Sequence, residues 1–172
     1  MFLFFYSGKV PVLIDDGFTI YESRAIARYL VNKYQGTKNS TILIPSDVQK
    51  AALIDQLISV ESSYYDGPIS KLIRQQVFAK KFFGTDPDPK IIKESLEELD
   101  KVLDVYEKLL EGKEYLAGEF SLADILHYPT THYAITTGRK FWNDPKRPNV
   151  ARWWKNISER ESWKKVASKI PS

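Results

Sequence analysis

The stretch that decides the fold runs from Gly8 to Leu30 and has the sequence GKVPVLIDDGFTIYESRAIARYL. Val10 to Ile14 is apolar and predicts a strand, Asp15-Asp16-Gly17 has the residues of a tight turn, and Phe18 to Ile20 can return as a second strand. From Ser23 to about Tyr34 the apolar residues follow helical spacing, and Ser23 can cap that helix. The stretch therefore predicts a β-hairpin followed directly by a helix.

Length and composition indicate a folded protein with one ordinary domain or two small ones. The chain has 172 residues, of which 43% are hydrophobic, 13% aromatic and 27% charged, and this composition excludes a disordered tail or a fibrous repeat. There is no cysteine in the sequence, so disulfides, thiolate metal sites and a cysteine nucleophile are excluded as well. Any sulfur chemistry must therefore come from a ligand.

The charge pattern and the start of the chain do not indicate nucleic-acid or membrane partners. The 25 basic and 22 acidic residues are interleaved and form no basic block, unlike a typical nucleic-acid-binding surface. The apolar start, Met1 to Tyr6, lacks a basic leader and is far shorter than the roughly 18 residues of a membrane span. We interpret this segment as a buried strand, with a weak export signal as the minor alternative, and the chain as cytoplasmic.

A polar, turn-forming stretch divides the chain near Gln35 to Asp47, where QGTKNST precedes the apolar ILIP. Such a cluster between two periodic segments is typical of a linker. We therefore expect a first domain at residues 1–36, a linker at residues 37–46 and an all-helical domain at residues 47–172.

The second domain is expected to consist of successive amphipathic helices. The first two run from Asp47 to about Asp66 and from Ile69 to Phe83, and Gly67-Pro68 between them predicts an interruption or a kink. Another helix starts at Pro89, a residue suited to a first helical turn. Its apolar residues recur at intervals of four and three and predict a buried stripe: Ile92, Leu96, Leu99, Leu103, Tyr106 and Leu110.

The remaining helices complete a mostly α fold. Ser121 followed by Asp124 resembles a capping box, and it predicts a helix through about Thr136. Two short helices are expected at Pro148 to Ser158 and at Ser162 to Lys169. The predicted fold is therefore an all-helical domain preceded by a small piece made of a β-hairpin and one helix.

Val10-Pro11, at the head of the first strand, is the first candidate for chemistry. A cis bond there would turn the N–H and C=O of Val10 away from the sheet, so that they could pair with an extended peptide. Taken by themselves, these two residues favour the alternative of an ordinary trans proline at a strand start. Both alternatives remain open at this point.

Glu22-Ser23, at the predicted start of the first helix, is the second candidate. The hydroxyl, the free N–H groups and the positive end of the helix dipole can together bind a carboxylate or a phosphate. Glu22 beside them could bind an ammonium group, so the pair suits the α-amino-acid end of a small molecule. The alternative is a plain helix cap without a ligand.

Taken in order, the opening stretch resembles the glutathione-binding half of a glutathione transferase. Further stretches are similar to the helical domain of the phi-like class of plants and fungi: VESSYYDGPISKLI, EELDKVLDVYEKLLEGKEYLAGEFSLADILHYP and RPNVARWWKNISERESWKKV. The resemblance extends from Gly8 to about Val166, with several motifs in the same order and spacing. It implies a thioredoxin-like first domain and an all-helical second domain.

The resemblance also implies roles for residues around the hairpin. Val10 would offer its backbone to the cysteinyl part of glutathione, with Pro11 cis. Glu22 and Ser23 would hold the γ-glutamyl part. Lys9, where phi-class proteins commonly have Gln, could meet the glycyl carboxylate as a point charge.

Further roles follow from the same resemblance. Arg24 matches a residue used at the dimer interface or in the network beneath the site. Three aromatic residues could line the pocket for the electrophile, namely Tyr64, Tyr65 and Phe83, although core packing is the alternative for at least one of them. Ser121 and Asp124 match the family's capping box, whose role is in folding.

The chain departs from the family pattern before Val10. The strand, helix and strand that open the family's first domain are not found there, nor is the Ser or Tyr hydroxyl that hydrogen-bonds the sulfur of glutathione. We therefore expect a truncated thioredoxin-like domain and leave the catalytic residue unassigned, since Ser7 does not occupy the matching position. Because attack requires a thiolate, we expect catalysis by this chain to be strongly reduced or absent.

The leading functional hypothesis is a homodimeric, detoxifying glutathione transferase that joins the glutathione thiol to hydrophobic electrophiles. Glutathione is then a co-substrate, and no cofactor or metal is expected. The alternative is a non-catalytic, transferase-like helical module for protein interaction or ligand binding. A metal site at His127 and His132 is not favoured, because a spacing of five residues does not put both on a common helix face.

Overall fold

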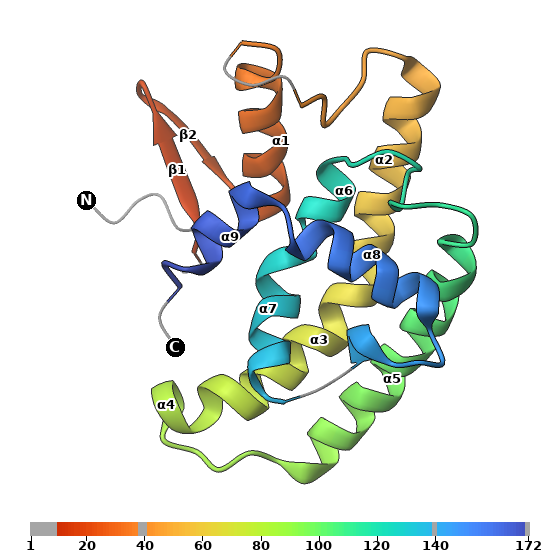
Figure 1. Cartoon of the computed structure of the whole chain (residues 1–172). Coiled ribbons are helices and arrows are strands. Elements are labelled where there is room, and N and C mark those ends of the chain that lie inside the picture. Colours follow the sequence, from red (N-terminus) through yellow and green to blue (C-terminus); the bar gives the residue numbers. More distant parts are fainter. Residues whose placement is uncertain (1–9, 38–40, 139–140, 171–172) are drawn as a thin grey trace.

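The computed structural model describes residues 10–37, 41–138 and 141–170, and its N-terminal part is the expected hairpin (Figure 1). Strands β1 (Val12–Asp15) and β2 (Phe18–Tyr21) pair antiparallel, with Val12 opposite Tyr21. Asp16 and Gly17 make the turn, both with positive φ, 49° and 83°. A two-residue turn of this kind matches the twist of the strands, which explains the Asp-Gly pair.

Helix α1 (Ser23–Tyr34) packs against the hairpin and is joined to it by polar contacts. Tyr29 donates its hydroxyl to Asp15 Oδ2 at 2.6 Å, and Lys33 forms an ion pair with the same carboxylate. The hydrogen bond from Lys33, followed by that from Tyr29, lowers the pKa of Asp15. The turn end of the hairpin is thus fixed to the second half of α1.

The end of the linker is attached to the end of α1 through Gln35. Its side-chain oxygen accepts from the N–H groups of Leu43 and Ile44 at 2.7 and 2.9 Å, and its nitrogen donates to the carbonyl of Ile44 at 2.6 Å. Leu43 in turn accepts from the N–H of Leu122 at 3.1 Å. Gln35 therefore holds the end of the linker against α1, and the Leu43 carbonyl joins the linker to the helical body.

The first helices of the body follow one another without an intervening loop and are joined by locally widened turns. Helix α2 (Val48–Val60) passes through a π-helical segment (Glu61–Tyr65) into α3 (Asp66–Ile73). A second π-helical segment (Arg74–Phe78) leads into α4, which spans Ala79–Phe83.

The expected interruption at Gly67-Pro68 is wrong in position, because both residues lie inside α3. The widened turn comes one turn earlier, at Glu61–Tyr65, where Asp66 N–H bonds to the Glu61 carbonyl. Proline lacks an N–H and its ring crowds the preceding turn. A π-bulge just before Pro68 accommodates the proline without ending the helix.

Helix α5 (Pro89–Leu109) is the long helix against which α3 and α8 pack. Asp88 caps it through the N–H of Lys90 at 2.8 Å, and Pro89 occupies the first turn as expected. Of the predicted stripe, Leu99, Leu103, Tyr106 and Leu110 are fully buried, while Ile92 and Leu96 pack at the margin of the core.

The last part of the chain forms short helices that pack against the helices before them (Figure 1). Helix α6 (Leu122–Ile125) is followed by α7 (Tyr128–Thr136), a short 3-10 turn (Phe141–Asn143), α8 (Pro148–Ser158) and α9 (Glu161–Ala167). The single helix expected from Ser121 to Thr136 is split in two. Pro129 lies in the first turn of α7 and cannot donate the N–H that would continue α6.

Asp124 confirms the predicted capping box and extends it into the core. It accepts from the N–H of Ser121 at 2.9 Å and from the hydroxyl of Ser121 at 3.1 Å. Its other oxygen accepts from Leu116 N–H at 3.1 Å and from Trp153 Nε1 at 2.9 Å. Asp124 is fully buried, so four donors compensate one buried carboxylate.

Within the part of the chain that the structure describes, no helix is both long and apolar enough to cross a membrane.

Candidate functional site

The open end of the hairpin brings the two candidate motifs together. Because Val12 pairs with Tyr21, the residues just before β1 and just after β2 lie at the same end of the sheet. Val10-Pro11 is a cis peptide bond, and Val10 is 84% exposed. Glu22 and Ser23 at this end are exposed as well. The two pairs that the sequence singled out therefore share one accessible corner.

Glu22, not Ser23, is the N-cap of α1, so the predicted cap is wrong by one residue. Ser23 is already the first helical residue, and the carbonyl of Glu22 accepts from Ile26 N–H at 2.9 Å. Glu22 has φ 69° and ψ 113°, which is rare for a residue with a side chain. This backbone turns the chain from β2 into α1 within a single residue, and such outliers are found at functional sites.

The first N–H groups of α1 lie at this corner. The Glu22 side chain makes no capping hydrogen bond, and the first N–H groups of a helix have no acceptor within the helix. Together with the partial positive charge of the helix end, they attract an anion. The Glu22 carboxylate next to them can attract a cation.

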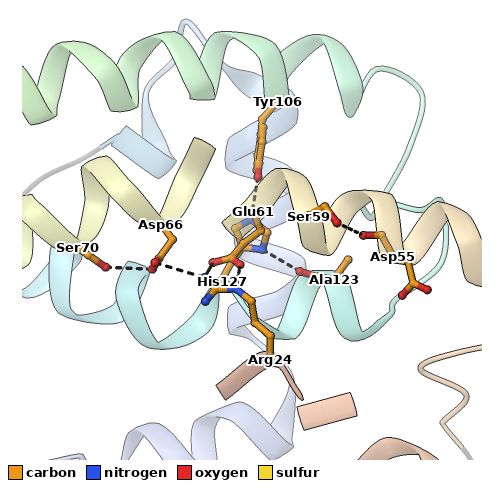
Figure 2. Close-up of polar contacts among 9 residues, drawn as sticks. All are labelled: Arg24, Asp55, Ser59, Glu61, Asp66, Ser70, Tyr106, Ala123 and His127. Atoms are coloured by element: carbon orange, nitrogen blue, oxygen red, sulfur yellow. Dashed lines mark hydrogen bonds and ion pairs between the residues drawn. The ribbon is translucent and has the colours of Figure 1, made fainter. Parts of the chain in front are cut away.

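Arg24 connects this corner to the helical body, as Figure 2 shows. Its Nε donates to Glu61 Oε2 at 2.6 Å and its Nη2 to Glu61 Oε1 at 2.9 Å, while Asp66 Oδ2 lies 3.5 Å from Nη2. Glu61 is 1% exposed. Burial raises the pKa of Glu61, and the hydrogen bonds from Arg24 oppose that rise. Arg24 therefore fixes the first turn of α1 to the helical body.

A second buried polar group lies behind Glu61 (Figure 2). His127 Nδ1 donates to the carbonyl of Ala123 at 2.8 Å, so its Nε2 accepts from the Tyr106 hydroxyl at 3.0 Å. Burial lowers the pKa of His127 to about 4. The imidazole is therefore neutral near pH 7 and has a structural role in this core.

The three aromatic residues expected at the electrophile pocket are not in equivalent positions. Tyr65 is fully buried, stacks on Tyr106 with ring centroids 5.8 Å apart and hydrogen-bonds Thr131. Its assignment to the pocket is corrected to core packing, because its ring has no access to a ligand. Tyr64 and Phe83 are 63% and 56% exposed, and both stay candidates.

Two other expectations concern Lys9 and metal binding. Lys9 lies outside the described residues. Among the residues that the structure does describe, no group of three His, Asp or Glu side chains is arranged to hold a metal ion. Both ring nitrogens of His127 are hydrogen-bonded, to the Ala123 carbonyl and the Tyr106 hydroxyl. The ring of His132 packs edge-on against Trp163.

Sequence reasoning did not assign a role to Glu61 or Asp66. A carboxylate on the apolar face of a predicted helix indicates a buried partner, and Glu61 has that position in the helix predicted from Asp47 to about Asp66. The identity of its partner depends on how α1 and α2 pack, and the sequence alone does not give this.

The fold defines a class of protein in which a hairpin-and-helix unit, with an exposed corner, lies beside an all-helical body. Residues 2–32 match the N-terminal domain of glutathione S-transferases, and residues 69–161 match the C-terminal domain. Glutathione S-transferase F10 of Arabidopsis thaliana is 42% identical over 163 residues, which cover 94% of this chain and 74% of that protein. Glutathione S-transferase hmp2 of the fungus Hypomyces subiculosus is 38% identical, with 94% and 76% covered.

Solved structures agree with these relatives. Glutathione transferase F7 of Populus trichocarpa superposes with a TM-score of 0.87 at 38% identity, covering 96% of this chain and 76% of that one. Maize glutathione S-transferase I, solved in complex with an atrazine glutathione conjugate, gives a TM-score of 0.79 at 35% identity, covering 94% and 73%. The chain belongs to the glutathione S-transferase family, and within it to the phi-like group.

Proposed function

We propose that the chain binds glutathione at the open end of the hairpin and that its reaction is conjugation of the glutathione thiol to hydrophobic electrophiles. The observation that carries the proposal is the meeting of Val10-Pro11 with Glu22-Ser23 at one exposed corner. Support also comes from maize transferase I, whose solved complex contains a glutathione conjugate of atrazine.

The proposed contacts follow the charges of glutathione. The γ-glutamyl carboxylate accepts hydrogen bonds from the Ser23 hydroxyl and the first N–H groups of α1. The γ-glutamyl ammonium group forms an ion pair with the Glu22 carboxylate. The backbone of Val10, next to Pro11, pairs with the cysteinyl residue. Lys9 meets the glycyl carboxylate.

Arg24 is proposed as a positioning residue, because it acts on the corner through Glu61 and the start of α1. Tyr64 and Phe83 are proposed for the electrophile. For conjugation, the thiol loses its proton to solvent and the thiolate sulfur attacks an electrophilic carbon, so that an S–C bond forms as the bond from that carbon to its leaving group breaks and the leaving group departs with the electron pair. The group that lowers the thiol pKa is unassigned, so binding and turnover are tested separately.

Calorimetric titration with glutathione tests the binding step. We expect a 1:1 isotherm, and Ser23→Ala should weaken it about tenfold, as expected for a lost hydrogen bond to a charged group. The matched control is Ser59→Ala, whose hydroxyl donates to the Asp55 carbonyl on α2 and should leave the affinity unchanged. A folded chain that gives no heat with glutathione would refute the ligand.

A turnover assay with an electrophilic aromatic substrate tests the second step. Conjugation supports the transferase assignment for this chain. Intact glutathione binding without turnover supports the alternative of a non-catalytic, transferase-like binding module. Homodimerisation and a cytoplasmic location belong to the same proposal. Analytical ultracentrifugation tests the first, and a purely monomeric species counts against it.

A further inference from the structure

The end of α4 combines exposed aromatic side chains with basic ones. Phe82 and Phe83 are 65% and 56% exposed, and they directly follow Lys80 and Lys81. The stretch 74–84, RQQVFAKKFFG, contains three basic side chains and no acidic one. Single exposed apolar residues are common on protein surfaces, whereas exposed apolar residues that adjoin one another mark interaction sites. We call Lys80, Lys81, Phe82 and Phe83 the α4 tip.

The backbone around the α4 tip is fixed by hydrogen bonds. Gly84 ends α4 in the left-handed conformation, with φ 63°, and the N–H of Thr85 donates to the Ala79 carbonyl at 3.1 Å. The N–H of Asp88 donates to the side-chain oxygen of Gln75 at 2.9 Å, which ties the following loop to the segment before α4. Figure 1 shows α4 at the periphery of the molecule, away from the hairpin. The α4 tip is therefore a defined, outlying surface.

The two phenylalanine rings of the α4 tip have different neighbours. Phe82 lies edge-on to Phe78 with ring centroids 5.5 Å apart, and Phe78 lies edge-on to Tyr133 on α7 at 5.4 Å. Phe78 and Tyr133 pack at the margin of the core, so this contact orients Phe82 at the surface. The guanidinium of Arg74 lies over the ring of Phe83, 5.0 Å from its centroid. Phe82, to which no other role is assigned, is thus the main apolar contact that the tip offers.

The charge of this region calls for an anionic partner. Within the described part of the chain, no ion pair joins Arg74 or Lys80 to a carboxylate, whereas Lys93 on α5 pairs with Glu97 at 3.9 Å. An acidic protein surface would complement the lysines but would not require an exposed phenylalanine beside them. A purely apolar partner would leave the ammonium groups without a countercharge. An anionic lipid surface meets both requirements, because its charged headgroups adjoin its acyl chains.

We propose that the α4 tip is a peripheral membrane contact, which docks on an anionic lipid bilayer. The ring of Phe82 enters the boundary between headgroups and acyl chains. Lys80 and Lys81 extend their aliphatic stems along that boundary, and their ammonium groups pair with the anionic headgroups. A contact of this kind lies on the bilayer and needs no membrane-spanning segment.

Vesicle co-sedimentation of the full chain tests the proposal, with equimolar phosphatidylcholine and phosphatidylglycerol compared with phosphatidylcholine alone. We expect binding to the anionic vesicles, weakening as the salt concentration rises, and little binding to the neutral ones. Replacing both Lys80 and Lys81 by Gln should weaken binding about tenfold or more. Phe82→Ala should weaken it about fivefold. Both variants should keep the thermal transition, because the substituted side chains are exposed.

The matched controls lie toward the other end of α5. Lys108→Gln with Lys113→Gln removes the same charge, and Val105→Ala shortens an apolar residue that is 60% exposed; both proteins should bind the vesicles fully. Equal binding to the two kinds of vesicle, or no binding to either, overturns the proposal. So does full binding by the double lysine variant or by Phe82→Ala. If Phe82→Ala turns a dimer into a monomer in ultracentrifugation, a second copy of the chain covers the tip, and the proposal is overturned as well.

Discussion

Arg24 donates to both carboxylate oxygens of Glu61, at 2.6 and 2.9 Å, and so joins the first turn of α1 to the helical body. The two residues are 37 positions apart in the sequence and belong to different parts of the fold. Ser23, which is proposed to bind glutathione, directly precedes Arg24. The ion pair therefore fixes the position of the proposed binding corner relative to the helices.

Glu61→Gln should destabilise the protein by about 2 kcal/mol, because it leaves a partly buried guanidinium facing a neutral amide. Urea unfolding measures the change. The matched control is Asp55→Asn, which breaks the more exposed ion pair between Arg28 on α1 and Asp55 on α2. It should cost less than about 1 kcal/mol. Equal changes in the free energy of unfolding for the two substitutions would show that the Arg24–Glu61 pair stabilises the protein no more than the exposed pair does.

His127 should make the protein acid-sensitive. Its pKa falls from an ordinary 6.5 to about 4 on folding because of burial, so the unfolded chain binds the extra proton between these values. The free energy of unfolding should therefore decrease as pH falls from about 6.5 to about 4, by about 3 kcal/mol in total. Below that window, this residue adds no further loss.

Unfolding free energies of His127→Gln at a series of pH values test this prediction. The variant should be less stable at pH 7 but should lack this part of the acid dependence. His132→Gln, which alters the partly exposed histidine, is the control and should keep it. If His127→Gln retains the full slope, another group causes the acid sensitivity.

Asp124 and Ser121 should differ in their effect on stability. Asp124→Asn should cost about 3 kcal/mol, because the amide group faces donors that have lost an acceptor. Ser121→Ala removes one hydroxyl and should cost about 1 kcal/mol. Thermal or urea unfolding gives both values. If both variants lose only about 1 kcal/mol in free energy of unfolding, the Asp124 carboxylate does not stabilise this part of the core more than the Ser121 hydroxyl does.

Local rules predicted the elements whose causes are local. The Asp16-Gly17 turn, the helix start at Pro89 and the Ser121–Asp124 box were predicted from neighbouring residues, and each is present. The π-helical segment before Pro68 was not predicted, because a widened turn has no sequence pattern of its own. The cap of α1 was misplaced by one residue because the backbone of Glu22 adopts an unusual conformation.

The candidate site was predicted less completely than the fold. The sequence named the pairs at the corner, and the hairpin register explains why they meet. Tyr65 was misplaced because adjacent residues of a helix point in different directions, and only packing decides which one is buried. The partners of Arg24 depend on contacts between distant segments, so no local pattern could reveal them.

The central claim is that glutathione binds where the hairpin opens onto α1, and amide NMR during a glutathione titration tests it most directly. We predict that the largest shift changes fall on the N–H groups of Ser23, Arg24 and Ala25 and on Val10 beside the cis bond. Ophthalmate, which has a methyl group in place of the thiol, should produce the same pattern. Saturable shifts elsewhere, with these amides unmoved, would contradict the claim.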